Sequence, residues 1–558
     1  CGGGFYNPAI SGIAATIEKG DPFMKKLVSL ALALILLLTC SSVLAVEYNE
    51  PGTFPICKEK VMLTVAVADN PKIENFETNL QTLFIEEQAN VDLVFEIYPR
   101  TDFNTKINLM VTSGDKLPDI IIGSFTSALV YSWANEGALA PLRAYYEDPS
   151  VAFYLNQAIE RTGTNFFSQM IMPDGEIYAV PTLNQSYGNE FPHKFFIYQP
   201  WLEKLNLKAP TTTDELFDVL YAMVNGDPNG NGIADEIGIA GYDGIRGQWF
   251  GYLMNSFVAS SCKVNFLTCD NGTLFYAYTT DAWKEGLKFV KKLYDNGIIP
   301  SETITQDQAQ WKTMINADDV TVASFMWTSA SQITTESKTR QYAYLVLPPM
   351  DGPAGLHYAA FEPSSCVPTF VISADCADPE TAFRVGYLMG NEYLSIMTRF
   401  GFEGTDWDYP ENVRYDISKY QISVPGSTPF LCGYDTGFWS QTQQNSSWMQ
   451  QGPYIRQYAI ANGWVREEKP LEEDPNAPVN YGADANSLYQ EGDYRPESPF
   501  TPLLFNTEEA EILVPIQAIL DSYVEEMTAA FIVGRKDIDT DWDAYLSELK
   551  TIGIDKAL

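Results

Sequence analysis

Histidine is nearly absent from this chain: among 558 residues, only His193 and His357 occur. An H-E-x-x-H zinc site needs two histidines on one helix face, so this class of metalloenzyme is excluded. The sequence also lacks the G-x-S-x-G nucleophile elbow and the G-x-x-x-x-G-K-[ST] phosphate loop, which excludes those hydrolase and nucleotide-binding motifs. We expect each histidine to be a surface or hydrogen-bonded residue rather than a catalyst.

Basic residues are scarce as well: 35 Lys and Arg stand against 72 Asp and Glu, which gives a formal net charge of -37. A surface with this charge repels phosphate backbones and anionic lipids, so we expect no nucleic-acid partner. The excess of acidic residues is interpreted as a solvated surface. The hydrophobic fraction of 46% is typical of a globular protein with a substantial core.

The eight cysteines include no C-x-x-C pair, so neither a zinc–thiolate site nor a dithiol redox site is predicted. Cys262 and Cys269 could close a small loop in an oxidising compartment. Buried free thiols are the alternative, and the sequence leaves both open.

A segment with the layout of a secretory signal begins at Met24. Two lysines follow this methionine, and residues 27–38 are apolar except for Ser29. The apolar run is shorter than the roughly 20 residues that a membrane-spanning helix needs. We therefore expect residues 24–45 to be a signal peptide that exports the protein.

Two cleavage sites compete within that segment. The sequence before Cys40 resembles a lipobox, in which the cysteine is acylated, whereas cleavage after Ala45 would release a protein without an anchor. We predict lipidation at Cys40, with residues 46–57 as a tether, and hence an extracellular or periplasmic protein on the outer face of the cell membrane. Residues 1–23 fit no signal peptide and are interpreted as a leader from a mis-assigned start.

The region after the tether has the pattern of an α/β fold. Residues 61–67, 91–98 and 119–122 are β-branched and apolar, and residues 74–88 and 104–111 suit helices between them. This β-α-β-α-β order predicts a mostly parallel sheet with helices on both faces. Ligands bind beyond the carboxyl ends of strands in such sheets, so the loop with Ser124 and Phe125 is a candidate binding wall.

A second α/β run follows a strand predicted over residues 177–181. The helix after Pro210 opens with a Thr212–Glu215 capping pattern, and Leu216, Val219, Leu220 and Met223 are spaced to line one of its faces. Further elements are predicted at residues 195–198, 282–296, 320–327 and 344–347, with mainly helices after Pro379. No repeat or long linker separates the two runs, so we expect two lobes that interleave in sequence.

The loop at residues 227–236 has the sequence DPNGNGIADE and the spacing of a calcium site. Asp227, Asn229 and Asn231 alternate around a glycine turn, and the carbonyl of Ile233 would add an oxygen, as in an EF-hand. Gly238 stands at the twelfth position, where an EF-hand has a bidentate carboxylate. A metal-free Asn/Gly turn is the alternative.

Four segments share the order and spacing of the motifs of one family. They are residues 113–120 (SGDKLPDI), 174–181 (DGEIYAVP), 201–216 (WLEKL, then PTTTDEL) and 401–407 (GFEGTDW). Together they resemble the bacterial extracellular solute-binding protein family 1, particularly its branch of oligosaccharide-binding lipoproteins and alginate-binding receptors. The resemblance also implies that Asp235 and Glu236 complete the shell of a structural Ca²⁺.

The resemblance implies a two-lobed periplasmic-binding-protein fold of class II, with a hinge, an interlobe cleft and extra C-terminal helices. We expect residues 58–178 and about 310–350 to form the N-terminal lobe, and residues 179–309 and about 351–558 the C-terminal lobe. The implied function is capture of a carbohydrate by a monomer that delivers it to separate ABC permease subunits.

Aromatic residues make up 13% of the chain, and flat rings stack on the apolar faces of sugars. We place the ligand site by topology at strand ends and in nearby loops, at Ser124, Phe125, Asn184, Tyr187, Trp249, Trp327, Glu362 and Trp439. No catalytic residue is predicted. A secreted carbohydrate-active enzyme is the first alternative, because two carboxylates suffice for glycoside hydrolysis. A ligand-bound sensor or adhesive surface protein is the second.

Overall fold

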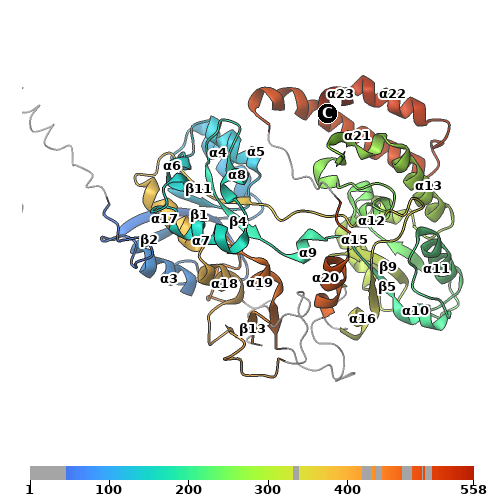
Figure 1. Ribbon diagram of the computed structural model, residues 1–558, viewed down its shortest axis with the longest axis horizontal. Coiled ribbons are helices and arrows are strands. Elements are labelled where there is room, and N and C mark those ends of the chain that lie inside the picture. The colour runs from blue at the N-terminus through green and yellow to red at the C-terminus, as the bar shows by residue number, and fades with distance from the viewer. Residues whose placement is uncertain are drawn as a thin grey trace, which may run out of the picture. The chain divides into compact units, whose positions relative to one another are not determined.

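The computed structural model describes residues 46–330, 338–417, 429–434, 443–467, 481–492, 494–496 and 505–558 (Figure 1). The chain divides into two compact units, residues 1–48 and 49–558, and the second unit contains all the sheets. The predicted leader, the signal segment and Cys40 lie outside the described residues. In the part of the chain that is described, no helix is long and apolar enough to cross a membrane.

The first sheet has six strands in the order β14-β4-β11-β3-β1-β2. Strand β1 (Val61–Ala68) pairs in parallel with β2 (Val91–Tyr98) and β3 (Ile120–Ile122), as their apolar sequences predict. β11 (Val367–Ile372) lies antiparallel between β3 and β4 (Ala179–Asn184), and β14 (Ile455–Arg456) is parallel to β4. The carboxyl ends of β1, β3 and β4 therefore meet at one edge.

The second sheet has four strands in the order β10-β5-β9-β6. β6 (Ile237–Ala240) is parallel to β9 (Val322–Trp327), whereas β5 (Lys194–Tyr198) is antiparallel to β9 and to β10 (Tyr344–Leu347). Lys194 pairs with Trp327, so the carboxyl ends of β6 and β9 share an edge with the start of β5.

The other strands form two smaller sheets. One joins β12 (Trp407–Asp408), β13 (Leu431–Gly433) and β15 (Trp464–Arg466), and the other is the hairpin of β7 (Leu267–Asp270) and β8 (Thr273–Tyr276). The hairpin turns at Asn271 and Gly272, both with positive φ, as an Asn-Gly turn requires.

The helices fall into two sets that Figure 1 shows around the two large sheets. The set near the first sheet is α3 (Leu80–Ala89), α4 (Phe103–Ser113), α5 (Ser127–Asn135), α6 (Arg143–Glu147), α7 (Phe153–Thr162), α8 (Phe166–Met170), α17 (Pro379–Met389), α18 (Glu392–Phe400) and α19 (Tyr458–Asn462). The set near the second sheet is α10 (Gln199–Lys204), α11 (Thr213–Asn225), α12 (Gln248–Met254), α13 (Asp281–Asp295), α14 (Glu302–Thr305), α15 (Gln308–Ile315), α16 (Lys338–Tyr342), α20 (Tyr481–Glu491), α21 (Thr507–Ile532), α22 (Trp542–Ile552) and α23 (Ile554–Ala557). The short α9 (Tyr187–Glu190) lies between β4 and β5 in the chain, and three 3-10 turns span Gly244–Arg246, Cys262–Val264 and Ala277–Thr279.

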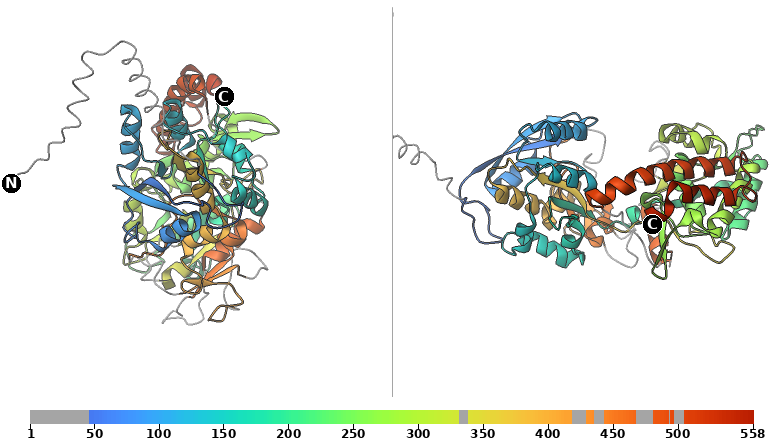
Figure 2. Two further views of the ribbon diagram at one scale, coloured as in Figure 1. Left: turned by 90° about the vertical axis from the view of Figure 1, so that its left-hand side faces the viewer. Right: turned by 90° about the horizontal axis from the view of Figure 1, so that it is seen from above.

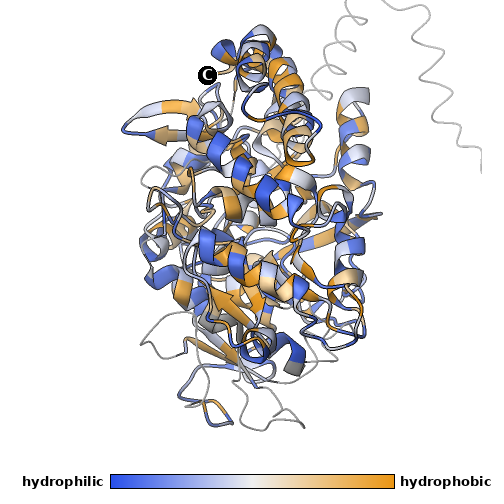
Figure 3. Cartoon of the chain, turned by 90° about the vertical axis from the view of Figure 1, so that its right-hand side faces the viewer, coloured by the Kyte–Doolittle hydropathy of each residue, from blue (hydrophilic) through white to orange (hydrophobic). Residues whose placement is uncertain are grey.

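Helix α11 forms as its sequence predicts. The Thr212 hydroxyl accepts a hydrogen bond from the Glu215 amide at 3.2 Å, which satisfies one of the free donors of the first turn. The predicted apolar stripe of Leu216, Val219, Leu220 and Met223 is buried in the core below the second sheet. Figure 3 shows the same alternation of apolar and polar faces along other helices.

The extra C-terminal helices belong to the second set. Helix α21, the long red helix in the right-hand view of Figure 2, begins at a capping box between Asn506 and Glu509 and packs on α13 and α22. Its side chains Leu520, Val524 and Phe531 join the core of the second sheet. These helices therefore extend that core rather than form a core of their own.

The strand pairing differs from the predicted division of the chain. Residues 310–350, expected beside the first sheet, contain β9 and β10 of the second sheet, whereas β11 and β14 from the later segment belong to the first sheet. The apolar run of each strand predicts that the strand exists but does not specify its neighbour, because either sheet offers a hydrophobic edge. The predicted helix over residues 74–88 is also shorter, since α3 starts only at Leu80, after Asn79 caps it.

Candidate functional site

A cavity of about 440 Å³ lies at the carboxyl edge of the first sheet, and we call it the first-sheet pocket. Ala68 ends β1, Ser124 follows β3, and Thr182 lies near the end of β4, so three strands bring these residues together. The remaining wall comes from the loop before α4, from β11 and from residues 450–454. Ser124 thus lies where the sequence predicts a binding wall.

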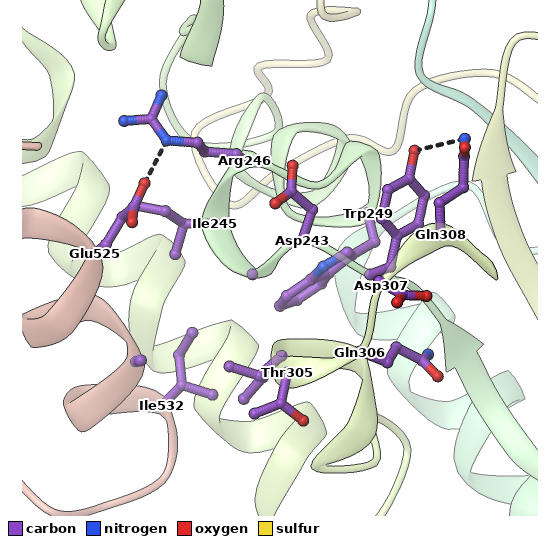
Figure 4. Close-up of a pocket in the computed structure, with 14 residues that line it drawn as sticks. Asp243, Ile245, Arg246, Trp249, Thr305, Gln306, Asp307, Gln308, Glu525 and Ile532 are labelled. Carbon is purple, nitrogen blue, oxygen red and sulfur yellow. Dashed lines mark hydrogen bonds and ion pairs between the residues drawn. The ribbon is translucent and has the colours of Figure 1, made fainter. Parts of the chain in front are cut away.

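A larger cavity of about 660 Å³ lies beside the loop that follows β6, and we call it the second-sheet pocket (Figure 4). Tyr242 and Gln308 line it, and the Gln308 amide donates a hydrogen bond to the Tyr242 hydroxyl at 3.2 Å. Arg246 lines it too and forms ion pairs with Glu525 and Asp521 of α21. The pocket combines an aromatic surface with donors and acceptors, which suits a polyhydroxylated ligand.

Trp249 lies in the wall of the second-sheet pocket and is only 1% exposed. Its Nε1–H is buried and has no hydrogen-bond partner among the described residues. Gly241 and Gly247 pack so closely on its ring that a Cβ at either position would overlap it. A buried indole donor without a partner is uncommon and costs free energy, so a ligand acceptor at this wall would relieve it.

Three aromatic rings gather where β6 and β9 end. The ring centroids of Tyr242 and Trp327 are each 5.2 Å from that of Trp311, and they are 6.0 Å from each other. Trp327 is half-buried, as a strand-end residue at the predicted edge should be. Trp311 is fully buried and anchors the cluster through a hydrogen bond from its Nε1 to the carbonyl oxygen of Ala240.

Lys194 begins β5 at this same edge and is completely buried. Its ammonium donates to the carbonyl oxygens of Phe191 at 2.7 Å and Thr328 at 3.2 Å, and no carboxylate pairs with it in the described residues. Burial lowers the Lys194 pKa to about 7. The neighbouring His193 is also buried, which lowers its pKa to about 3 with the help of the positive Lys263 and Lys194.

Several predicted ligand residues instead lie at the segments that join the two sheets. Tyr187, in α9 after β4, is buried and stacks on Tyr458 with ring centroids 5.0 Å apart. Asn184 ends β4 half-buried, and Glu362 pairs with Lys263 while its backbone amide donates to the Glu190 carbonyl at 2.9 Å. Burial raises the pKa of Glu362. These residues lie where the chain passes between sheets and line neither pocket.

The carboxylate of Glu190 connects these joining segments. It is 2% exposed and accepts hydrogen bonds from the hydroxyls of Ser364, at 2.8 Å, and Tyr458. Arg495 lies 3.7 Å from its second oxygen. Sequence reasoning missed Glu190, because a single Glu in a polar loop carries no pattern that marks it as buried.

Two further predictions for the ligand site have different outcomes. Phe125 is 3% exposed and packs edge-on against Trp133, so it faces the core instead of the groove. Trp439 lies outside the described residues. Ser124 is the predicted ligand residue that lines the first-sheet pocket, and the residues that the sequence missed there include Arg100, Gln450 and Tyr454.

The candidate metal loop connects α11 to β6. Gly230 and Gly232 have positive φ of 81° and 76°, so the glycines allow the tight turn that the sequence predicts. The Asp227 carboxylate accepts from the Gly230 amide, and Asn229 and Asn231 donate to Asp235. The twelfth position is closed to a carboxylate, since any side chain at Gly238 would clash with Ile298.

One observation favours a cation at this loop. Glu236 is 7% exposed, and its Oε1 is buried without a hydrogen-bond partner among the described residues. Within the described residues no three His, Cys, Asp or Glu side chains gather as a metal cluster, so Ca²⁺ here would also need Asn oxygens and the exposed Ile233 carbonyl. That mixed set of oxygen ligands is the one that Ca²⁺ takes in proteins.

Comparison with known proteins gives relatives over nearly the whole chain. The fructooligosaccharide ABC transporter substrate-binding protein FusA of Streptococcus pneumoniae is 26% identical over 96% of each chain. A solved structure of an extracellular solute-binding protein from Bifidobacterium longum subsp. infantis matches with a TM-score of 0.67 at 20% identity, over 89% of this chain and 96% of that one. A structure of the S. pneumoniae FusA EF-hand mutant in complex with fructo-nystose matches with a TM-score of 0.65 at 21% identity, over 89% and 97%.

These structures share the two-lobed fold that the sequence motifs imply. The family model for bacterial extracellular solute-binding proteins matches residues 82–392, which is more than half of the chain. The matched range contains the two large sheets apart from β1 and β14, and it contains residues of both pockets. The chain therefore belongs to the bacterial extracellular solute-binding protein family.

Proposed function

We propose that the protein is the receptor of an ABC importer and that it captures an oligosaccharide between its two lobes. The second-sheet pocket is the main support, because Tyr242, Gln308 and the unpartnered Trp249 indole offer a ring face together with polar contacts. The relative FusA is named as a fructooligosaccharide-binding protein of such a transporter. We also propose that the protein is a monomer and that it delivers the bound oligosaccharide to separate permease subunits.

We propose that each lobe contains one of the two large sheets. The first lobe comprises about residues 49–190 and 359–467, and the second comprises about residues 191–358 and 481–558, so the chain passes between lobes three times. Each lobe contributes one pocket at the carboxyl edge of its sheet. Ser124 and Trp249, which line the pockets, remain proposed ligand residues. Trp327 also remains one, because it lies beside the pocket residue Tyr242 although it lines neither pocket itself. Asn184, Tyr187 and Glu362 are proposed to act at the joining segments.

A calorimetric screen of fructans and uronate oligomers first identifies the oligosaccharide that binds. We then expect Tyr242→Leu to weaken the binding of that oligosaccharide about tenfold. Loss of one stacking ring and its hydroxyl corresponds to about 1.4 kcal/mol of binding free energy. The matched control is Tyr221→Leu, since Tyr221 is 44% exposed and lines neither pocket. Equal affinities for the two variants, or turnover of the bound glycan, would contradict the receptor proposal.

The protein is further proposed to be exported and attached to the outer face of the membrane through an acylated Cys40. Membership of an extracellular family and the signal-like residues 24–45 support this. Mass spectrometry of the native, membrane-extracted protein tests the anchor. A mature chain that begins at Val46 supports release instead, and one that retains Met24 excludes both forms.

A structural Ca²⁺ at residues 227–236 is proposed as well. Asp227, Asn229, Asn231, Asp235 and Glu236 would supply side-chain oxygens, and Ile233 its carbonyl. The name of the FusA EF-hand mutant indicates a comparable loop in that relative. When bound, Ca²⁺ would supply positive charge that neutralises these carboxylates and fixes how α11 meets β6.

Chelation with EGTA is expected to lower the melting temperature by a few degrees. Extracellular calcium sites have Kd values of roughly 0.1–1 mM, and occupancy at ten times Kd adds about 1.4 kcal/mol to the folded state. Asp227→Ala and Asp235→Ala should each abolish this calcium-dependent shift, whereas Asp214→Ala, which removes a carboxylate that is 90% exposed, should leave it intact. Identical melting curves with and without EGTA in the native protein would exclude the site.

A further inference from the structure

The first-sheet pocket differs in charge from the rest of this acidic protein. Among the described residues that line it, Arg100 is charged and none is Asp or Glu. The second-sheet pocket, by contrast, is lined by Asp243, Asp307 and Glu525 together with Arg246. Because the whole chain has a formal charge of -37, a pocket without acidic residues is a local exception.

A buried guanidinium lies directly behind the wall of this pocket. Arg456, at the end of β14, is 1% exposed, and its Nη2 donates to the Gln450 side-chain oxygen at 2.6 Å. Its guanidinium carbon also lies 4.1 Å from the ring centroid of Tyr454. Gln450 and Tyr454 both line the pocket, so only one layer of side chains separates Arg456 from the cavity.

In the described parts of the chain, no carboxylate pairs with the guanidinium of Arg456. Its Nε and Nη1 are buried without hydrogen-bond partners among the described residues. Burial is the main cause that lowers the Arg456 pKa to about 9; Tyr454 opposes this shift, and a second arginine, Arg399, adds to it. A buried charge without a counter-ion is strongly unfavourable in a protein interior, so an anion near this position would stabilise the arrangement.

Arg399 donates to the same acceptor as Arg456, the Gln450 side-chain oxygen. Nη1 of Arg399, in α18, donates to the Gln450 side-chain oxygen at 3.1 Å, so two guanidinium groups share one neutral amide oxygen. Met449 and Gln450 both have positive φ, 48° and 68°, an unusual conformation for residues other than glycine. This backbone places the Gln450 side chain between the two arginines and the pocket.

Another part of the wall comes from the amino end of α4, where the carboxylate of Asp102 opposes the partial positive charge of the helix end. Phe103 and Asn104, in the first turn of the 11-residue helix α4, line the pocket, and the side chain of the preceding Asp102 makes no capping hydrogen bond. The amino end of a helix is a site of partial positive charge. Arg100 lines the same wall and is exposed to solvent.

We propose that the first-sheet pocket binds a sugar residue that bears a carboxylate, a uronic acid, with Arg456 as the counter-charge behind the pocket wall. This inference rests on the proposed carbohydrate-binding function and specifies its substrate class as acidic glycans. The hydroxyls of such a residue find partners in Ser124, Thr182 and Asn104 around the cavity. The carboxylate lies on the side of Gln450 and Tyr454.

Calorimetry with three probes tests the inference on the full chain: trigalacturonate, the neutral trisaccharide kestose, and acetate as an anion without a sugar. We expect trigalacturonate to bind at least tenfold more tightly than kestose, with an affinity that falls as NaCl rises from 50 to 500 mM. Arg456→Met is expected to weaken the binding of trigalacturonate at least thirtyfold and the binding of kestose less than threefold. Arg414→Gln, which removes one positive charge from a side chain that lines neither pocket, is the control and should change neither affinity.

A second variant keeps the test open if Arg456→Met does not fold. Arg100→Gln alters an exposed side chain at the pocket wall and should weaken the binding of trigalacturonate about threefold to tenfold and that of kestose by a smaller factor. Binding of kestose without binding of trigalacturonate would overturn the inference and leave the proposed function intact. If acetate binds as tightly as trigalacturonate, the pocket is a simple anion site and the inference also fails. If no glycan of either charge binds, both proposals fall.

Discussion

Replacing Lys194 by Met is expected to abolish a rise in the unfolding free energy of this protein between about pH 7 and pH 10. The folded-state pKa of Lys194 is lowered by burial to about 7 from the ordinary value of 10.5. Between these values the unfolded chain retains a proton that the folded chain has lost, so raising the pH favours the folded state. The effect is fully developed above the unfolded pKa and is lost as the pH falls through about 7.

The expected size makes this effect measurable. The complete difference corresponds to about 4 to 5 kcal/mol, of which about 2 kcal/mol accrues between pH 7 and pH 9. Urea unfolding at pH 7, 8 and 9 compares the native chain with Lys194→Met, and the native curve should become more stable relative to the variant as the pH rises. Lys60→Met is the matched control, because the Lys60 side chain is 58% exposed. Parallel pH profiles for the native chain and Lys194→Met would show that Lys194 titrates normally.

His193 contributes in a separate pH range. Its pKa is lowered by burial to about 3 from 6.5, so the folded state binds fewer protons than the unfolded state in between. Stability from this group is therefore present above the unfolded pKa and falls as the pH drops from about 6.5 toward 3. Measurements at pH 7 and above keep the Lys194 effect free of this contribution.

Glu190→Ala is expected to destabilise the protein by about 3 kcal/mol, because it removes a buried acceptor shared by two partly buried hydroxyls and leaves Ser364 only the Asn184 carbonyl, at 3.3 Å. The Tyr458 hydroxyl stays protonated and able to donate, since burial, followed by its hydrogen bond to Glu190, raises its pKa. Ser364 loses the same acceptor. Ser364 lies in the segment that leads from the second sheet to β11, and Tyr458 begins α19, so the loss acts on the first-sheet side of the junction between the sheets.

The conservative variant separates hydrogen bonding from charge. Glu190→Gln keeps the oxygen that accepts from Ser364 and Tyr458, but it removes the charge that faces Arg495, which is 46% exposed. We expect a loss of about 1 kcal/mol for this variant. Glu285→Ala removes a carboxylate that is 59% exposed and serves as the control in the same urea titrations. A loss for Glu190→Ala no larger than that of the control would show that this carboxylate does not stabilise the junction.

Local elements of this fold could be predicted from the sequence. Helix α11 follows from the Thr212 cap and the 3.6-residue spacing of its apolar stripe, and β2 follows from the alternating, β-branched residues Val91–Tyr98. Both signals act over a few residues, so short stretches of sequence contain them in full. The glycines of the 227–236 loop are predicted for the same reason, because positive φ is a property of single positions.

Long-range pairing could not be predicted in this way. β10 and β11 are both short apolar strands, yet one pairs with β5 and the other inserts between β3 and β4. The walls of the first-sheet pocket come from segments as distant as Ala68 and Tyr454. Arg456 is a polar residue in a two-residue strand, and only the packing around it shows that it is buried.

The position of β11 determines the order in which the chain can fold. β3 and β4 cannot be joined until residues 367–372 are available, and those residues follow the whole of the second sheet in the chain. The second sheet needs only β5, β6, β9 and β10, which follow one another in sequence with helices and the β7–β8 hairpin between them. Contacts between distant residues form slowly because closing a long loop costs entropy. The strands of the second sheet can therefore pair first, while β3 and β4 present open edges that are vulnerable to aggregation until β11 is available. The core of the second sheet is completed later, because α21, α22 and α23 come from the end of the chain.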